Sequence, residues 1–197
     1  EAVYRVMDEP NSVDFAKRLA VAAKEAKSEL VVAIGGGKCM DLCKVFADMA
    51  GLPIITVPTS VATCAGSSAV SIMYTKENGS YDCSIPKDKE IDSVIVDLDI
   101  IGSSPKQLFA SGIMDSIAKL PEIVNGTAKL TYPEVSLQKY MAYSNSVFIY
   151  DFLTRFGVQV YENPMGDEKL LQDLTLVNLI VTSMVSGFSS GSDQLAV

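Results

Sequence analysis

The chain has 197 residues, of which 48% are apolar and 20% are charged, enough for one or two domains with hydrophobic cores. It contains no histidine, so these residues alone cannot supply an imidazole base, a Ser-His-Asp triad or a histidine-bearing zinc site. The net charge of −8 has the wrong sign for a protein that tracks phosphate backbones, and we expect no nucleic-acid partner.

The absence of targeting signals predicts the compartment. No apolar run approaches the roughly 20 residues of a membrane span, so we expect no membrane partner. The acidic residues within 1–9 differ from the basic start of a signal peptide. We therefore expect a cytoplasmic protein whose four cysteines, which form no CxxC pair, are reduced thiols.

The first part of the chain alternates between strand and helix patterns. Asn11 or Ser12 can cap the first helix, and the continuous apolar run at 30–34 is typical of a strand buried on both faces of a parallel sheet. A helix between two such strands forms a βαβ crossover. In chain order, the predicted elements are a strand at 3–7, a helix at 12–27, a strand at 30–34, a helix at 38–50 and a strand at 53–57.

The next segments change from strand to helix. Asn78-Gly79 separates two alternating segments and favours a tight hairpin between them. The sequence predicts hairpin strands at 70–75 and 80–85, a last strand at 93–98, and helices at about 105–120, 133–156 and 168–186. We therefore expect an α/β domain over 1–101 and an all-helical domain over 102–197.

Three glycines, Gly35, Gly36 and Gly37, separate a predicted buried strand from the first turn of a helix. Free N–H groups and the positive end of the helix dipole face such a turn, and glycines let a phosphate approach the backbone. The pattern matches neither G-x-G-x-x-G nor the P-loop. A phosphate site and a turn that only allows tight strand–helix packing explain it equally well.

A second loop, at 57–70, is rich in small and hydroxylated residues and follows the next buried strand. Ligands of open α/β sheets bind outside the carboxyl ends of the strands. We therefore expect this loop and the glycine turn to face one crevice. The alternative is that the loop is an ordinary Ser/Thr-rich connection. Because two such loops are expected at the same edge of the sheet, this alternative is less favoured than a ligand site.

Together these residues resemble the glycerol dehydrogenase branch of the iron-containing (group III) alcohol dehydrogenase superfamily. Gly35-Gly36-Gly37-Lys38 with Asp41 and Lys44 is similar to the signature GGGK-x-x-D-x-x-K, and Val57-Pro58-Thr59 is similar to the PT loop that follows it. The resemblance implies a Rossmann-like parallel sheet with a hairpin, then an all-helical part. It also implies a homo-oligomeric, NAD(P)-dependent and divalent-metal-assisted oxidoreductase of a small polyol or 2-hydroxy acid.

The resemblance assigns the cofactor, NAD or NADP, to residues of the first domain. The glycine turn that Gly35 opens belongs to this cofactor-binding set. The pyrophosphate is expected at Gly36, Gly37, Lys38 and Asp41, and the rest of the cofactor at Thr59, Ser68, Val70 and Tyr74.

Asp115, in the segment 111–119, is similar to the aspartate that ligates the family's divalent metal, Zn or Fe, together with two histidines. A solvated ion pair with Lys119 at i, i+4 is the alternative on the helix pattern alone. Residues 186–197 are similar to the segment that leads into the first metal histidine. The resemblance therefore implies that the metal site is incomplete in this sequence, and that the first βαβ portion of the α/β domain is missing.

Cys64 stands where glycerol dehydrogenases carry an aspartate that contacts the polyol hydroxyls. A thiol is a poor hydrogen-bond acceptor, and Thr63-Cys64-Ala65 is closer to the hydroxycarboxylate dehydrogenase type, whose members reduce 2-oxo acids with NAD(P)H. We therefore predict Cys64 as a residue of the substrate site. A buried, unreactive thiol is favoured over a nucleophile, because no basic partner lies nearby in the sequence.

Two alternatives to this enzyme stay open. The chain could be a nucleotide-binding fragment without activity, because the metal histidines are absent from it. The dehydroquinate synthase and glycerol-1-phosphate dehydrogenase relatives share the two-domain plan, but the Thr63-Cys64-Ala65 loop does not fit the histidine-bearing counterpart of the latter.

Overall fold

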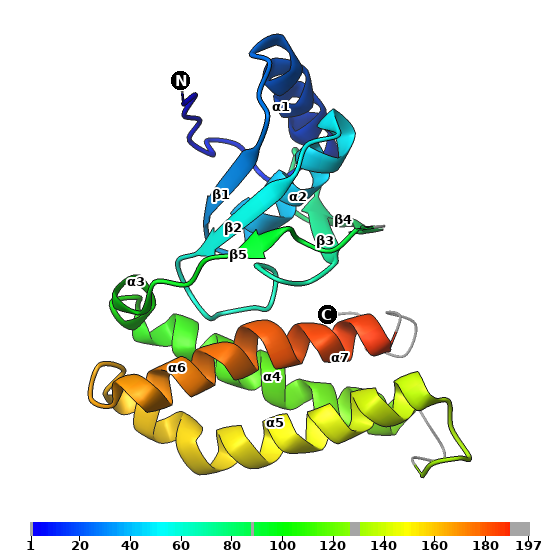
Figure 1. The fold of residues 1–197 in the computed structure, drawn as a ribbon, viewed down its shortest axis with the longest axis vertical. Coiled ribbons are helices and arrows are strands. Elements are labelled where there is room, and N and C mark those ends of the chain that lie inside the picture. The colour runs from blue at the N-terminus through cyan, green and yellow to red at the C-terminus, as the bar shows by residue number, and fades with distance from the viewer. Residues whose placement is uncertain (1, 88, 127–130, 190–197) are drawn as a thin grey trace. The chain divides into compact units, whose positions relative to one another are not determined.

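The computed structural model describes residues 2–87, 89–126 and 131–189, and it forms two compact units (Figure 1). The α/β unit comprises Glu1–Thr59 and Ala65–Val96, and the helical unit comprises Ser60–Cys64 and Asp97–Val197. The predicted fold class, α/β followed by all-helical, is confirmed. The helical unit begins at Asp97, not at residue 102, and it also takes in the short loop Ser60–Cys64.

A three-stranded parallel sheet forms the centre of the α/β unit, with the strand order β1-β2-β5. The hydroxyl of Ser12 caps the first helix by accepting from the N–H of Phe15 at 3.2 Å, and Gly51 ends the second helix in the left-handed conformation, with φ of 72°. The elements are α1 (Val13–Glu25), β1 (Val31–Gly35), α2 (Gly37–Ala50), β2 (Ile54–Pro58) and β5 (Ser93–Val94).

An antiparallel hairpin of β3 (Val70–Tyr74) and β4 (Tyr81–Pro86) completes this unit, with Ser71 opposite Ile85. The hairpin predicted around Asn78-Gly79 is confirmed, since Gly79 has a φ of 67°, which favours glycine. Met73 of β3 is fully buried in a core shared with α1 and α2. That core contains Phe15, Ala16, Leu42, Val45 and Met73.

Two predictions about strands are wrong at the ends of this unit. Residues 3–7 form no strand in the described chain, and their apolar side chains Val3 and Val6 are exposed without a neighbouring strand to pair with. The strand predicted at 93–98 is only two residues long. Asp97 ends it by capping α3 (Leu98–Gly102), because its carboxylate accepts from the N–H groups of Asp99 and Ile100, each at 3.0 Å.

The prediction that the run 30–34 is buried on both faces is also wrong. Val31 and Ala33 of β1 are buried, but Val32 is 51% exposed and Ile34 is 61% exposed. The buried face packs against α2, in a core of Val31, Ala33, Met40, Ala47 and Ile54. No described element of this unit covers the opposite face of β1, so its apolar side chains meet solvent there.

The helical unit consists of long helices that lie side by side (Figure 1). The three predicted long helices are confirmed, although the last is interrupted by a π-helical turn. The buried core of the helical unit includes Phe109, Ile149, Leu153, Leu174 and Val185. The elements are α4 (Lys106–Gly126), α5 (Leu137–Glu162), α6 (Glu168–Leu176), the π-helix η1 (Val177–Val181) and α7 (Thr182–Phe188).

The continuous helical run Glu168–Phe188 contains an 18-residue window with a mean hydropathy of 1.3, so it is long and apolar enough to cross a membrane by length and composition alone. The expectation that no segment approaches this threshold is therefore wrong. Of the window concerned, 44% is buried inside the protein. A core helix of a bundle has the same composition, so this run is weak support for a membrane span.

Candidate nucleotide site and substrate loop

The glycine turn packs closely against the first turn of α2, and no side chain caps the start of that helix. Gly35 has a φ of 157°, and a Cβ atom there would lie 2.8 Å from the Cβ of Cys39. Gly36 is the N-cap of α2, and no side chain caps this helix. A Cβ atom on Gly36 would meet nothing within 4 Å. The turn therefore offers uncapped helix N–H groups to a phosphate with open space beside them.

Predicted cofactor residues from three segments meet at this turn. The ammonium of Lys38 lies 5.2 Å from the centroid of the Tyr74 ring, a cation–π distance. The backbone N–H of Thr59 donates to the carbonyl of Gly35 at 2.9 Å. The end of β2, the glycine turn and the end of β3 thus lie close together.

Lys44 ties α2 to the start of β3. It is fully buried, and its ammonium lies 3.0 Å from the Asp41 carboxylate. It also donates to the backbone carbonyl of Ser68 at 3.0 Å and to that of Val70 at 2.6 Å. In the sequence, Lys44 stands out only as one position of the GGGK-x-x-D-x-x-K motif, which does not reveal that its side chain is buried. Its position between apolar residues of α2 could have indicated this burial.

Asp41 is buried beside Lys44 instead of lying exposed at the turn. Burial raises the pKa of the Asp41 carboxyl, and the Lys44 ammonium and the N–H of Ile72 oppose this shift. Because its carboxylate is held by Lys44, we expect Asp41 to influence a bound pyrophosphate through the position of α2. The hydroxyl of Ser68 accepts from the N–H of Val70 at 3.2 Å and so shapes the same loop.

Cys39 and Cys43 lie one turn apart on α2, next to the glycine turn. Hydrogen bonding from the Cys43 thiol lowers the pKa of Cys39 to about 7, and partial burial opposes the shift. The position of Cys39 in the first turn of the helix favours its thiolate in the same direction. The same interaction and burial raise the pKa of Cys43 above its ordinary range.

The predicted substrate and metal residues, Cys64 and Asp115, both belong to the helical unit. Burial raises the pKa of Asp115, and the charge of Lys119 opposes this shift. Lys119 is itself buried and forms an ion pair with Glu122, with 3.1 Å between the ammonium and the carboxylate. A solvent-exposed ion pair between Asp115 and Lys119, the alternative considered from the sequence, is therefore not observed on α4.

No group of three His, Cys, Asp or Glu side chains that could hold a metal ion occurs among the described residues. The segment 190–197, which belongs to the predicted approach to the metal histidines, lies outside the described residues. Asp115 alone does not make a metal centre.

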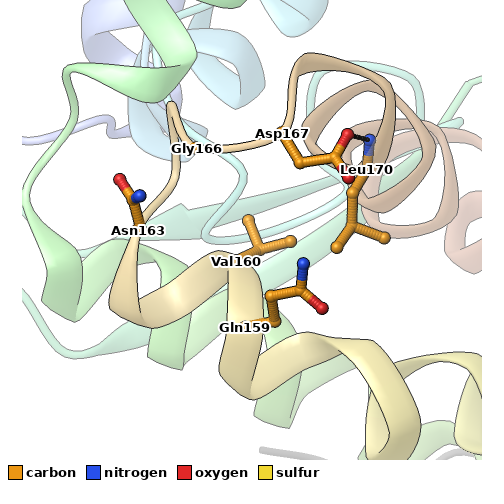
Figure 2. Close-up of a pocket in the computed structure, with 6 residues that line it drawn as sticks. All are labelled: Gln159, Val160, Asn163, Gly166, Asp167 and Leu170. Carbon is orange, nitrogen blue, oxygen red and sulfur yellow. Dashed lines mark hydrogen bonds between the residues drawn. The ribbon is translucent and has the colours of Figure 1, made fainter.

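The helical unit contains a pocket of about 110 Å³ where α5 turns into α6 (Figure 2). Asp167 is the N-cap of α6, and its carboxylate accepts from the N–H of Leu170 at 3.0 Å. None of the predicted site residues lines this pocket. Its lining consists of Gln159, Val160, Asn163, Gly166, Asp167 and Leu170, so the pocket belongs to the turn between the two helices.

Comparison with known proteins gives these features a family. Residues 2–97 match the family model for iron-containing alcohol dehydrogenase. The chain is 30% identical over 173 residues to glycerol dehydrogenase of Thermotoga maritima, covering 85% of this chain and 46% of that protein. It is 28% identical over 183 residues to hydroxycarboxylate dehydrogenase A of Escherichia coli K12, covering 91% and 49%.

A solved structure shows the same fold. Sulfoacetaldehyde reductase from Bifidobacterium kashiwanohense, solved in complex with NAD+, matches with a TM-score of 0.68 at 21% identity, covering 88% of this chain and 48% of that one. The two proteins therefore share their fold over the matched region. These matches support a place for the chain in the iron-containing alcohol dehydrogenase superfamily. It spans about half the length, or less, of the curated relatives that it matches.

The Asp41–Lys44 pair predicts a coupled loss of stability. Replacing either partner leaves the other charge buried without its counterion, so Asp41→Asn and Lys44→Met should each lower the free energy of unfolding by about 3–5 kcal/mol. The double variant should lose less than the sum of the two. Urea denaturation of the three variants measures this, and strictly additive losses would contradict a direct interaction.

The thiol pair predicts unusual reactivity at neutral pH. Alkylation of Cys39 by iodoacetamide, followed by peptide mass spectrometry, should increase with a midpoint near the pKa of about 7. Cys43→Ala should move this midpoint toward the value of about 8.5 for a free thiol, whereas Cys43→Ser keeps a donor and should move it less. A midpoint that stays unchanged in Cys43→Ala would show that Cys43 does not stabilise the thiolate.

Proposed function

We propose that the chain binds NAD or NADP on its α/β unit and serves the NAD(P)-dependent interconversion of a small polyol or 2-hydroxy acid with its carbonyl form. The observation that carries this proposal is the uncapped start of α2 at Gly36, with open space beside it. The match of residues 2–97 to the iron-containing alcohol dehydrogenase model and the NAD+ complex of a structural neighbour support it.

The residues at the turn suit a dinucleotide pyrophosphate. The N–H groups of the first turn of α2 and the helix dipole stabilise negative charge at Gly36 and Gly37. Lys38 adds a positive charge, and the ring of Tyr74 beside it adds an apolar surface for the rest of the cofactor. We assign the contacts to the rest of the cofactor, beyond the pyrophosphate, to the segments that contain Thr59, Ser68 and Val70.

The substrate is assigned to the loop that carries Cys64. When bound, the nicotinamide supplies the hydride acceptor or donor of the reaction. A thiol cannot replace a carboxylate as an acceptor for polyol hydroxyls, so we place the 2-hydroxy acid ahead of glycerol. The similarity to hydroxycarboxylate dehydrogenase A supports this choice. Asp115 stays a predicted metal ligand without an assigned step.

A nucleotide-binding protein without turnover is the second candidate. The observation in its favour is that the sequence has no histidine and that the described residues offer no group of three metal ligands. The two candidates share cofactor binding and differ in chemistry. Oxidation of NADH in the presence of pyruvate, a simple 2-oxo acid, would support the dehydrogenase, and tight NADH binding without oxidation would support the second candidate.

Calorimetric titration with NADH tests the shared claim. The unchanged chain should give a saturable heat of binding with one site per chain. The absence of heat at high protein concentration would contradict cofactor binding by these residues. The same titration with NADPH decides between the two cofactors.

Gly36→Ser should separate stability from binding. Serine is a slightly better N-cap than glycine and Gly36 has the extended backbone of an N-cap, so the stability should be kept or raised by about a few tenths of a kcal/mol. Its side chain would occupy the space where the phosphate approaches, so NADH affinity should fall at least about tenfold, or 1.4 kcal/mol. Thermal unfolding and calorimetry measure the two effects.

Gly187→Ser provides the matched control. Gly187 lies in α7 of the helical unit, and a Cβ atom there would meet nothing within 4 Å. This variant should bind NADH like the unchanged chain. Equal NADH affinity of Gly36→Ser and the unchanged chain would place the phosphate somewhere other than the glycine turn.

A further inference from the structure

The loop Ser60–Cys64 sits on α4 at a point where only a glycine fits. Val61 is fully buried, and a Cβ atom on Gly112 would lie 1.8 Å from its carbonyl oxygen and 2.7 Å from its carbonyl carbon. These atoms belong to the backbone, which no side-chain rotation can move aside. Alanine at position 112 therefore cannot coexist with the observed position of the loop.

Asn178 contacts the same carbonyl. Its side chain is 1% exposed, and its amide nitrogen donates to the carbonyl oxygen of Val61 at 3.4 Å. The same nitrogen lies 2.9 Å from the Cβ position of Gly112. The amide oxygen of Asn178 is buried without a hydrogen-bond partner in the part of the chain that the structure describes. An unsatisfied buried amide oxygen costs free energy, so its presence calls for an explanation.

The π-helix explains why Asn178 faces α4. Asn178 is the second residue of η1 (Val177–Val181), and the N–H of Thr182 bonds to the carbonyl of Val177 across the wide turn. The hydroxyl of Thr182 lies 3.0 Å from that of Ser116 on α4. Residues 112 and 116 of α4 thus meet residues 178 and 182, four apart on both helices. A π-turn inserted in an α-helix frequently marks a functional site.

We propose that Gly112 and Asn178, the loop clamp, are positioning residues that fix the substrate loop on α4. This inference rests on the proposed function, in which the loop presents Cys64 to the substrate. Asp115, the predicted metal ligand, follows Gly112 by three residues and so lies on the adjacent turn of α4. The loop clamp therefore makes Cys64 part of the helical unit, to which Asp115 belongs, although the loop directly follows β2 in the chain.

Hydrogen exchange and thiol labelling test the loop clamp without requiring activity. In Gly112→Ala, amides of residues 60–64 should exchange faster, and iodoacetamide should label Cys64 faster, each by about tenfold or more. Asn178→Ala should have the same effect at about a few-fold, because it removes one hydrogen bond and creates no collision. Circular dichroism should report unchanged helix content, and NADH affinity should stay unchanged in both variants.

Gly187→Ala is the control, because the added methyl group meets open space on α7; it should leave loop exchange and Cys64 labelling unchanged. If Gly112→Ala does not fold, Asn178→Ala decides. Unchanged exchange and labelling of the loop in a folded variant would overturn the proposal, as would acceleration spread evenly over α4, α5 and α7.

A kinetic readout separates this inference from the proposed function. If pyruvate supports NADH oxidation, the loop-clamp variants should raise the KM for pyruvate and leave the KM for NADH unchanged. A chain that binds no NADH would refute the proposed function, while the local change in exchange at 60–64 would still show the loop clamp.

Discussion

A buried ammonium group holds together the two sides of the candidate cofactor site. Lys44 is completely removed from solvent, and a charge in that position costs several kcal/mol unless it is paired and hydrogen-bonded. Asp41 provides the counterion, and the carbonyls of Ser68 and Val70 accept its hydrogens. Because α2 starts at the glycine turn and β3 starts at Val70, these bonds fix the phosphate end of the site against the segment that leads to Tyr74.

Local signals in the sequence predicted most of the fold. The caps and turns at Ser12, Gly51 and Gly79 are decided by the residues themselves, and the helices and the hairpin that they bound are observed. The errors arise where residues far away in the sequence determine whether a segment is buried or pairs as a strand. Val32 and Ile34 have the pattern of a doubly buried strand, but α2 covers only the other face of β1. Residues 3–7 include the strand-favouring Val3, Tyr4 and Val6, but no strand lies beside them in the described part of the chain.

The predicted site residues separate cleanly between the two units. All nine cofactor residues, from Gly35 to Tyr74, fall in the α/β unit, and Cys64 and Asp115 fall in the helical unit. The motif resemblance placed these residues, but motif positions do not reveal which side chains are buried. Lys44 and Asn178 are polar residues within apolar helix faces, and their tertiary partners, Val70 and Val61, are far away in the sequence. Each donates to a backbone carbonyl next to a predicted site segment.

We propose that the glycine turn of α2 receives the cofactor phosphates. Titrating the isotopically labelled chain with NADH and following the backbone amides by NMR tests it most directly. We expect the largest shift changes at Gly36, Gly37 and Lys38, with smaller ones at Thr59 and Tyr74. Changes confined to the helical unit, for example at the pocket lined by Asp167 and Leu170, would contradict it.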